Sequence, residues 1–215
     1  MNILLASATI TEIRPFLEQY RKKANSFTHP IDVLITGIGL MAATYSLTKQ
    51  LHIKRPDLVI QAGIAGCFDS QLELGEVVLV KQDIVADLLV MENNKASTLF
   101  DLGLIKPNQF PFNQQWLVNK SDFVKKLKLK KEKGISINEV TTNKSRISLY
   151  KELFDPAIES MEGAALHYTC LSEKIPFLQI RAISNYVGER NKKNWKMKES
   201  IVNLNKELAE LLKRI

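Results

Sequence analysis

The 215-residue chain has little of the chemistry that builds metal sites or disulfide frameworks, since it holds two cysteines and three histidines. Cys67 and Cys170 stand far apart, in no spacing typical of zinc ligands or of a disulfide framework. The chain also lacks any run of 18 apolar residues, and its first residues lack the basic start and long apolar stretch of a signal peptide. We therefore expect a soluble, cytoplasmic protein with no metal and no membrane partner.

Positive charge exceeds negative charge, with 30 Lys and Arg against 23 Asp and Glu. The basic residues concentrate in residues 125–133 and 192–198, with Trp195 as the single aromatic residue within these runs and outside any known nucleic-acid motif. We interpret these runs as solvated helix faces and expect no nucleic-acid partner. The net positive charge still favours an anionic small substrate.

Short apolar, β-branched runs alternate with longer helical patterns along the chain, which is typical of an α/β fold with a parallel or mixed sheet. At this length the most economical organisation is a single domain over residues 1–215. Strands are expected at 3–6, 33–36, 58–62, 77–85, 135–140, 157–160 and 177–184, and helices at 11–21, 41–52, 144–153, 162–173 and 194–214.

Residues 91–120 are the least regular part of the chain and carry two prolines and several aromatic residues. Segments of this length inside a compact domain are commonly functional or mobile. Two interpretations stay open: a surface excursion with its own small apolar cluster, or a lid or partner contact.

Two glycine-rich segments each follow an expected strand. The segment Gly37-Ile38-Gly39 fits the dinucleotide-binding fingerprint, which would indicate a nicotinamide-dependent oxidoreductase. That fingerprint also requires an acidic residue at the end of the next strand, whereas Asp57 precedes its strand. The second segment, residues 63–66, is predicted to form a turn whose backbone amides approach a sugar or an anion closely.

Polar side chains stand where an open α/β sheet places ligand chemistry. Glu12 lies in the first turn of an expected helix, Glu162 begins another, and Ser184 and Asn185 end a strand. Taken singly, both glutamates are also explained as acids stabilised by the helix dipole, and Asn185 is also explained as a turn residue.

In order and spacing, these segments make the chain resemble the purine nucleoside phosphorylase and nucleosidase superfamily over nearly its full length. Glu12, the glycine segments and Met161-Glu162-Gly163 resemble the methylthioadenosine/adenosylhomocysteine nucleosidase branch, and residues 183–190 resemble futalosine hydrolases within it. The resemblance implies a single-domain three-layer sandwich with a mixed central sheet flanked by helices. It also implies a homodimer or larger homo-oligomer and no cofactor.

The resemblance assigns roles that suit cleavage of a ribosyl bond through an oxocarbenium-like state. Glu12 would activate water, Glu162 would hold the ribose hydroxyls with Met161 beside the sugar, and Asn185 would face the purine. The other residues assigned to substrate binding are Ala62, Gly63, Val140, Ser160 and Ser184.

Asn185 separates this chain from the adenine-specific nucleosidases, which carry Asp at that position. A primary amide offers NH₂ to a 6-oxo group and C=O to a protonated N7, so Asn suits hypoxanthine. The sequence therefore predicts an N-glycosidase that cleaves futalosine to hypoxanthine and dehypoxanthine futalosine in menaquinone biosynthesis. The alternatives are a methylthioadenosine/adenosylhomocysteine nucleosidase, a purine nucleoside phosphorylase and a non-catalytic binding protein.

Futalosine also carries a benzoate, and Arg190 would form a bidentate contact with its carboxylate. The alternative for Arg190 is the start of a solvated basic helix.

Overall fold

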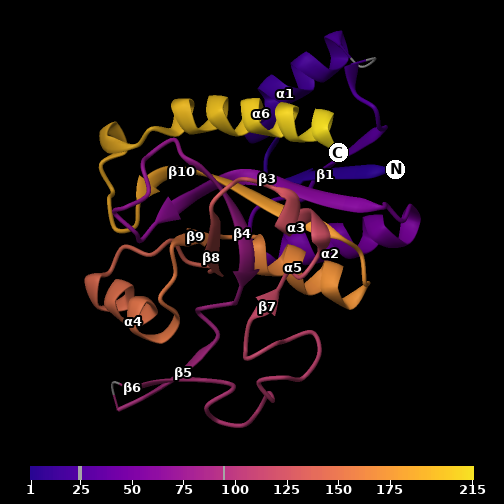
Figure 1. Ribbon diagram of the computed structural model, residues 1–215. Coiled ribbons are helices and arrows are strands. Elements are labelled where there is room, and N and C mark those ends of the chain that lie inside the picture. Colours follow the sequence, from indigo (N-terminus) through magenta and orange to yellow (C-terminus); the bar gives the residue numbers. More distant parts are fainter. Residues whose placement is uncertain (24–25, 94) are drawn as a thin grey trace.

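An 8-stranded mixed sheet forms the centre of the protein (Figure 1). The computed structural model describes residues 1–23, 26–93 and 95–215. The strands of this sheet are β1 (Ile3–Ser7), β2 (Ile31–Ile35), β3 (Leu58–Cys67), β4 (Val77–Asp83), β7 (Leu117–Val118), β8 (Lys131–Ser136), β9 (Ile158–Ser160) and β10 (Phe177–Tyr186). Their order is β10-β4-β8-β9-β3-β1-β2, and β7 pairs with β4.

The sheet closes on itself at one end because β3 pairs with both β9 and β10. The strands β3, β10, β4, β8 and β9 thus form a closed circuit of pairings, from which β1 and β2 extend in parallel. Closure brings the ends of β3, β9 and β10 to one place. That place is the position of the candidate site.

Helices cover both faces of the sheet (Figure 1). The helices α1 (Ile10–Lys22) and α6 (Met197–Arg214) lie on one face, and α2 (Leu40–Ile53) and α5 (Gly163–Ser172) lie on the other. The remaining helices are α3 (Asp122–Lys126) and α4 (Lys144–Phe154). The predicted α/β fold, with a mixed central sheet flanked by helices, is confirmed.

Apolar spacing explains why α6 packs where it does. Its residues Leu204, Leu208, Leu211 and Leu212 recur every three or four positions and are at most 1% exposed. They join the core cluster that α1, β3 and β10 share. Burying each such side chain contributes about 1.5–3 kcal/mol to folding, so this one stripe anchors the helix.

Most element boundaries agree with the sequence prediction. The strand predicted at 135–140 is instead β8, which spans Lys131–Ser136, and three further predictions also differ from the structure. The strand predicted at 58–62 continues to Cys67, because the glycine segment stays extended and pairs with β9 and β10 instead of turning. The last helix begins at Met197 because Lys192–Asn194 forms a separate 3₁₀ turn capped by Asn191. The basic run 125–133 is also not one helix face, since α3 ends at Lys126 and β8 begins at Lys131.

The irregular segment between β4 and β7 contains a two-stranded sheet of β5 (Leu89–Glu92) and β6 (Lys95–Thr98). Its aromatic residues form a small cluster: Phe100 meets Phe112 at a centroid distance of 5.2 Å, and Phe112 meets Tyr168 of α5 at 6.3 Å. Other apolar side chains of the segment, Leu104 and Phe110, are 69% and 64% exposed. The segment thus has its own apolar cluster and also offers apolar surface.

Among the described residues, no helix combines the length and the apolar character that a membrane crossing requires.

Candidate active site

A cavity of about 470 Å³ opens at the ends of β1, β3, β9 and β10. The start of α1 and the start of α6 complete its walls. Its lining residues are Ala8, Thr9, Thr11, Glu12, Ile38, Ile64, Ala65, Gly66, Ile137, Val140, Glu159, Ser160, Met161, Glu162, Ser184, Asn185, Trp195, Met197 and Ile201. The structure thus brings both predicted glutamates and Asn185 to one cavity.

Glu12 is held rigidly because the start of α1 is built around its carboxylate. Its Oε2 accepts hydrogen bonds from Thr9 N at 3.0 Å, Thr9 Oγ1 at 3.0 Å and Ser7 Oγ at 3.2 Å, which forms a capping box. Its Oε1 accepts from Ile64 N at 3.0 Å. The helix cap and the site therefore use the same side chain, and the carboxylate is fixed against β3.

Glu162 is fixed from two sides. Its Oε1 accepts from Gly39 N at 3.1 Å, and its Oε2 lies 3.5 Å from Arg181 Nη1. Gly39 has φ 92°, a left-handed conformation that glycine adopts readily. In this structure the Gly37-Ile38-Gly39 segment therefore positions a carboxylate of the cavity, which explains its glycines without a dinucleotide.

Arg181 is a buried residue beside the candidate site that the sequence analysis missed. Its side chain is 2% exposed, its Nη2 donates to Gln61 Oε1 at 2.8 Å, and its Nη1 donates to Ile64 O at 3.4 Å. A Cβ added to Gly63 would lie 2.5 Å from Arg181 Nη1 and 2.9 Å from Glu12 Oε1. Gly63 therefore lets the guanidinium approach both glutamates. An arginine inside an apolar strand was the available signal, because such residues are buried only when paired.

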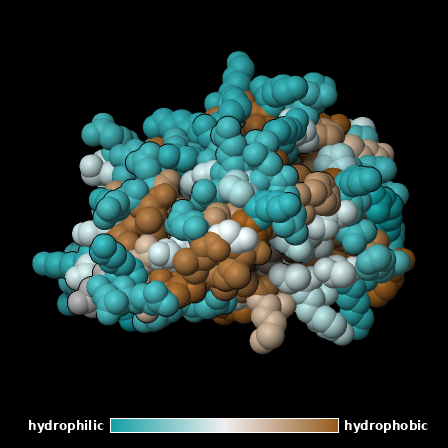
Figure 2. All heavy atoms as spheres, turned by 90° about the horizontal axis from the view of Figure 1, so that it is seen from below, coloured by the Kyte–Doolittle hydropathy of each residue, from teal (hydrophilic) through white to brown (hydrophobic). Residues whose placement is uncertain are grey.

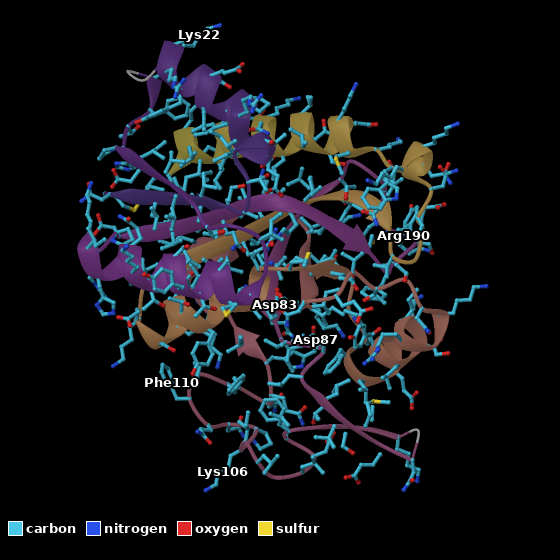
Figure 3. The ribbon with its side chains drawn as sticks, turned by 180° about the vertical axis from the view of Figure 1, so that it is seen from behind. Lys22, Asp83, Asp87, Lys106, Phe110 and Arg190 are labelled. Atoms are coloured by element: carbon cyan, nitrogen blue, oxygen red, sulfur yellow. The ribbon has the colours of Figure 1, made fainter. Side chains whose placement is uncertain are left out.

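The first turn of α5 rests on a buried hydroxyl network behind the cavity. Gly163 N donates to Ser160 Oγ at 3.2 Å, and Ala164 N donates to Ser136 Oγ at 2.7 Å. Ser136 Oγ in turn donates to Asp83 Oδ1 at 2.9 Å, and Figure 3 shows Asp83 in the interior. Burial raises the pKa of Asp83 to about 7. Ser160, predicted to bind substrate, lines the cavity and also caps the helix that carries Glu162.

Asn185 stands beside Gly66 at a bulge in the pairing of β10 with β3. Its Oδ1 accepts from Ser184 Oγ at 2.8 Å, and its Nδ2 donates to Tyr186 O at 3.2 Å. A Cβ at Gly66 would lie 3.4 Å from Asn185 Nδ2, so the glycine leaves room for the amide. Both Asn185 and the adjacent Ser184 line the cavity. Asn185 was predicted to face the purine, and Ser184 was predicted to bind substrate.

Three of the predicted substrate-binding residues lie outside the cavity lining. Ala62 is fully buried in β3, and Gly63 acts through the space it leaves. Arg190 is exposed in the loop after β10, at the periphery in Figure 3, and it does not begin a helix. That loop instead directs Trp195 to the cavity, and the indole Nε1 donates to Glu189 O at 3.0 Å.

Glu159, immediately before Ser160, is a second cavity residue that the sequence analysis missed. It is 7% exposed and lies between two predicted site segments. An isolated acid within the short apolar run 157–160 was its signal in the sequence. Among the described residues, no group of three His, Cys, Asp or Glu side chains has the arrangement of a metal site.

The sequence matches the profile of the Phosphorylase superfamily over residues 5–215. The chain belongs to that superfamily. This confirms the resemblance found in the sequence.

Individual members of the superfamily are similar over most of the chain. A futalosine hydrolase of Thermus thermophilus is 28% identical over 83% of this chain and 80% of its own length. A 5'-methylthioadenosine/S-adenosylhomocysteine nucleosidase of Buchnera aphidicola is 26% identical over 87% of this chain and 80% of its own length. The solved structure of a Helicobacter pylori futalosine hydrolase aligns with a TM-score of 0.80 at 17% identity, covering 100% of this chain and 98% of that one, and it supports the superfamily fold.

We expect Glu12→Gln to lower turnover of a nucleoside substrate by about 10² to 10⁴, the usual effect of losing a general base. The NH₂ group of the glutamine would also face one of the groups that now donate hydrogen bonds to the Glu12 carboxylate, so one of these bonds would be lost. The free energy of unfolding should therefore fall by about 1–3 kcal/mol. Turnover and denaturant unfolding of purified variants check both effects.

Glu18→Gln is the matched control, because Glu18 is exposed on the same helix. Near-normal turnover of Glu12→Gln would remove Glu12 from the role of base.

Proposed function

We propose that this protein hydrolyses the N-glycosidic bond of a 6-oxopurine nucleoside, futalosine, in menaquinone biosynthesis. The observation that carries the proposal is the convergence of Glu12, Glu162 and Asn185 on one cavity. The named relatives support nucleosidase chemistry, and one of them is a futalosine hydrolase.

The arrangement suggests how cleavage proceeds. Glu12 accepts the proton of a water molecule that attacks the sugar carbon, since its carboxylate is fixed at the cavity wall. The bond from that carbon to the purine nitrogen breaks, and the base leaves with the bonding electrons and takes up a proton from solvent, to which Glu12 later returns its own. Glu162 holds the ribose hydroxyls as an acceptor, because its carboxylate is already oriented by Gly39 and Arg181. Arg181 lies against the carboxylate of Glu162 and keeps it in place as charge develops on the sugar.

Water is favoured over phosphate as the nucleophile. Among the described residues that line the cavity, none is a lysine or an arginine. Arg181 is occupied by Glu162, Gln61 and Ile64. A phosphorylase would require free cationic side chains that converge on the phosphate.

The base is the 6-oxopurine in this proposal because position 185 carries an amide. The second candidate is a methylthioadenosine/adenosylhomocysteine nucleosidase, which the Buchnera relative supports. The two candidates share the sugar chemistry and differ at the base, so the base released decides between them.

The first test is to incubate the purified protein with futalosine, inosine, methylthioadenosine and adenosylhomocysteine, with and without phosphate. We expect hypoxanthine and a free sugar derivative from futalosine, at a rate indifferent to phosphate, because water is the nucleophile. Chromatography identifies the products. A ribose 1-phosphate product would reject hydrolysis, and preferential release of adenine would favour the second candidate.

Asn185→Asp should lower the ratio of kcat/KM for futalosine to that for methylthioadenosine by about 5-fold to 150-fold, because one mismatched buried polar pair costs about 1–3 kcal/mol. The control is Asn143→Asp, the same change at the N-cap of α4, where Asp caps equally well. An unchanged ratio at position 185 would mean that Asn185 does not read the base.

We also propose that the active unit is a homodimer assembled through an apolar face. Large apolar side chains of α2 and of the segment before β7 are exposed, and Figure 2 shows brown apolar areas on this side, bordered by hydrophilic residues. Met41 and Tyr45 on α2 are 85% and 67% exposed. Apolar surface of this kind commonly marks a contact between proteins.

Met41→Asp should therefore sediment as a monomer while the unmodified protein sediments as a dimer. The fold itself should not suffer, since Met41 is exposed in the single chain. Val202→Asp is the control, because Val202 is 60% exposed on α6, which covers the opposite face of the sheet. Sedimentation of the unmodified protein as an active monomer at assay concentration would overturn the dimer.

A further inference from the structure

Glu159 and Asn185 flank the same glycine in the sheet. Gly66 of β3 pairs with Glu159 of β9 on one side and with Asn185 of β10 on the other. Paired residues of neighbouring strands lie about 5 Å apart, so the two backbones are separated by about 10 Å across Gly66. Both side chains line the cavity, so the strands on either side of Gly66 each contribute one polar group to it.

The carboxyl group of Glu159 is buried without full compensation. Its Oε1 accepts one hydrogen bond, from Thr141 N at 3.3 Å, and its Oε2 has no partner among the described residues. Burial raises the pKa of Glu159; the hydroxyl and the backbone amide of Thr141 partly offset that rise, and the charge of Asp87 adds a smaller increase. A buried carboxyl oxygen without a donor is costly to folding unless something else supplies the donor.

The neighbours of Glu159 supply no compensating cation. Thr141 comes from the loop after β8, and Asp87 comes from the segment after β4. Tyr150 on α4 lies near Glu159, and the charge of Glu159 helps to raise the pKa of Tyr150. The guanidinium of Arg146 lies over the Tyr150 ring and forms no ion pair with Glu159. No ion pair joins Glu159 to a cation among the described residues.

The charged and titratable groups on the other surrounding elements complete this environment. On β3 the thiol of Cys67 follows Gly66, and burial raises the pKa of that thiol to about 11. Glu12 and Glu162 line the same cavity. Apart from the nearby hydroxyl of Thr141, a bound substrate is the remaining source of a donor for Oε2 of Glu159.

We propose that Glu159 determines base specificity by accepting the N1–H of a 6-oxopurine whose other edge is read by Asn185. This inference rests on the proposed nucleosidase function and deepens it. A 6-oxopurine carries a hydrogen on N1 and an acceptor at O6, whereas adenine has a lone pair on N1 and a donor at the 6-amino group. An ionised carboxylate accepts from the first and repels the second.

The same geometry makes discrimination depend on pH. Protonation gives the carboxyl of Glu159 a hydrogen to donate, which suits N1 of adenine and no longer suits N1–H of hypoxanthine. Because the pKa of Glu159 is raised, this change occurs above the ordinary range of a glutamate. The preference for 6-oxopurine should thus be greatest above that pKa and should decline as the pH falls through it.

The test compares futalosine with its 6-amino analogue, which differs only at the base. Glu159→Gln should lower the ratio of their kcat/KM values by about 5-fold to 150-fold, because the amide both donates and accepts and no longer discriminates. The ratio for the unmodified protein should fall as the pH is lowered, and the ratio for the variant should be flat. Glu139→Gln, in the exposed loop before Val140, is the control and should leave both the ratio and its pH dependence unchanged.

Binding of free hypoxanthine and free adenine, measured by calorimetry, provides a readout that does not require turnover. The unmodified protein should prefer hypoxanthine, and Glu159→Gln should lose that preference. If the variant does not fold, the pH dependence of base binding by the unmodified protein decides the matter.

Unchanged discrimination in Glu159→Gln, or a pH-independent preference in the unmodified protein, overturns the role of Glu159 while leaving the nucleosidase intact. Failure of the unmodified protein to cleave any of the nucleosides instead overturns the proposed function.

Discussion

A single buried guanidinium organises the site. Arg181 lies against Glu162, Gln61 and the backbone of Ile64, and the glycine beside it admits Glu12 to the same place. A buried cation is tolerated only with partners, and removing one partner of such a group typically costs about 3–5 kcal/mol. Glu162 and Arg181 therefore depend on one another, while Glu12 is held by Ser7, Thr9 and Ile64 and shares with Arg181 the space that Gly63 leaves between β10 and β3.

The glycines around the site are explained by the side chains that pack closely against their backbone. Gly63 leaves space for two charged side chains, and Gly66 leaves space for Asn185. Gly163, after Glu162, has no room for a side chain, because an added Cβ would collide with Asp83 and Gln179. At Gly63 and Gly163 the absence of a side chain is required by packing against polar groups, which a tight turn alone would not demand.

The sequence was sufficient to predict most of the larger elements, though not α3, β5, β6, β7 or the position of β8. It was also sufficient to predict the convergence of Glu12, Glu162 and Asn185, because strand ends in an α/β sheet lie together. It was not sufficient to predict the pairing of β3 with both β9 and β10. Without that pairing the glycine segment was predicted to be a turn, and neither Arg181 nor Glu159 could be placed beside the site residues. The position of Arg190 could not be predicted either, because a residue close to Asn185 in sequence need not reach the cavity. Trp195, from the same loop, lines the cavity instead.

The cavity has a polar side and an apolar side. Glu12, Glu162, Glu159 and Asn185 come from the ends of strands and the starts of helices, where backbone amides and paired side chains hold them. The apolar wall comes from Ile38, Trp195, Met197 and Ile201, on the glycine segment and around the start of α6. Ile38 is 62% exposed and lies next to α2, so the cavity wall is continuous with the face proposed to bind a second copy of the chain. The polar side is thus complete within one chain, whereas the apolar side is the part of the site whose shape assembly would change.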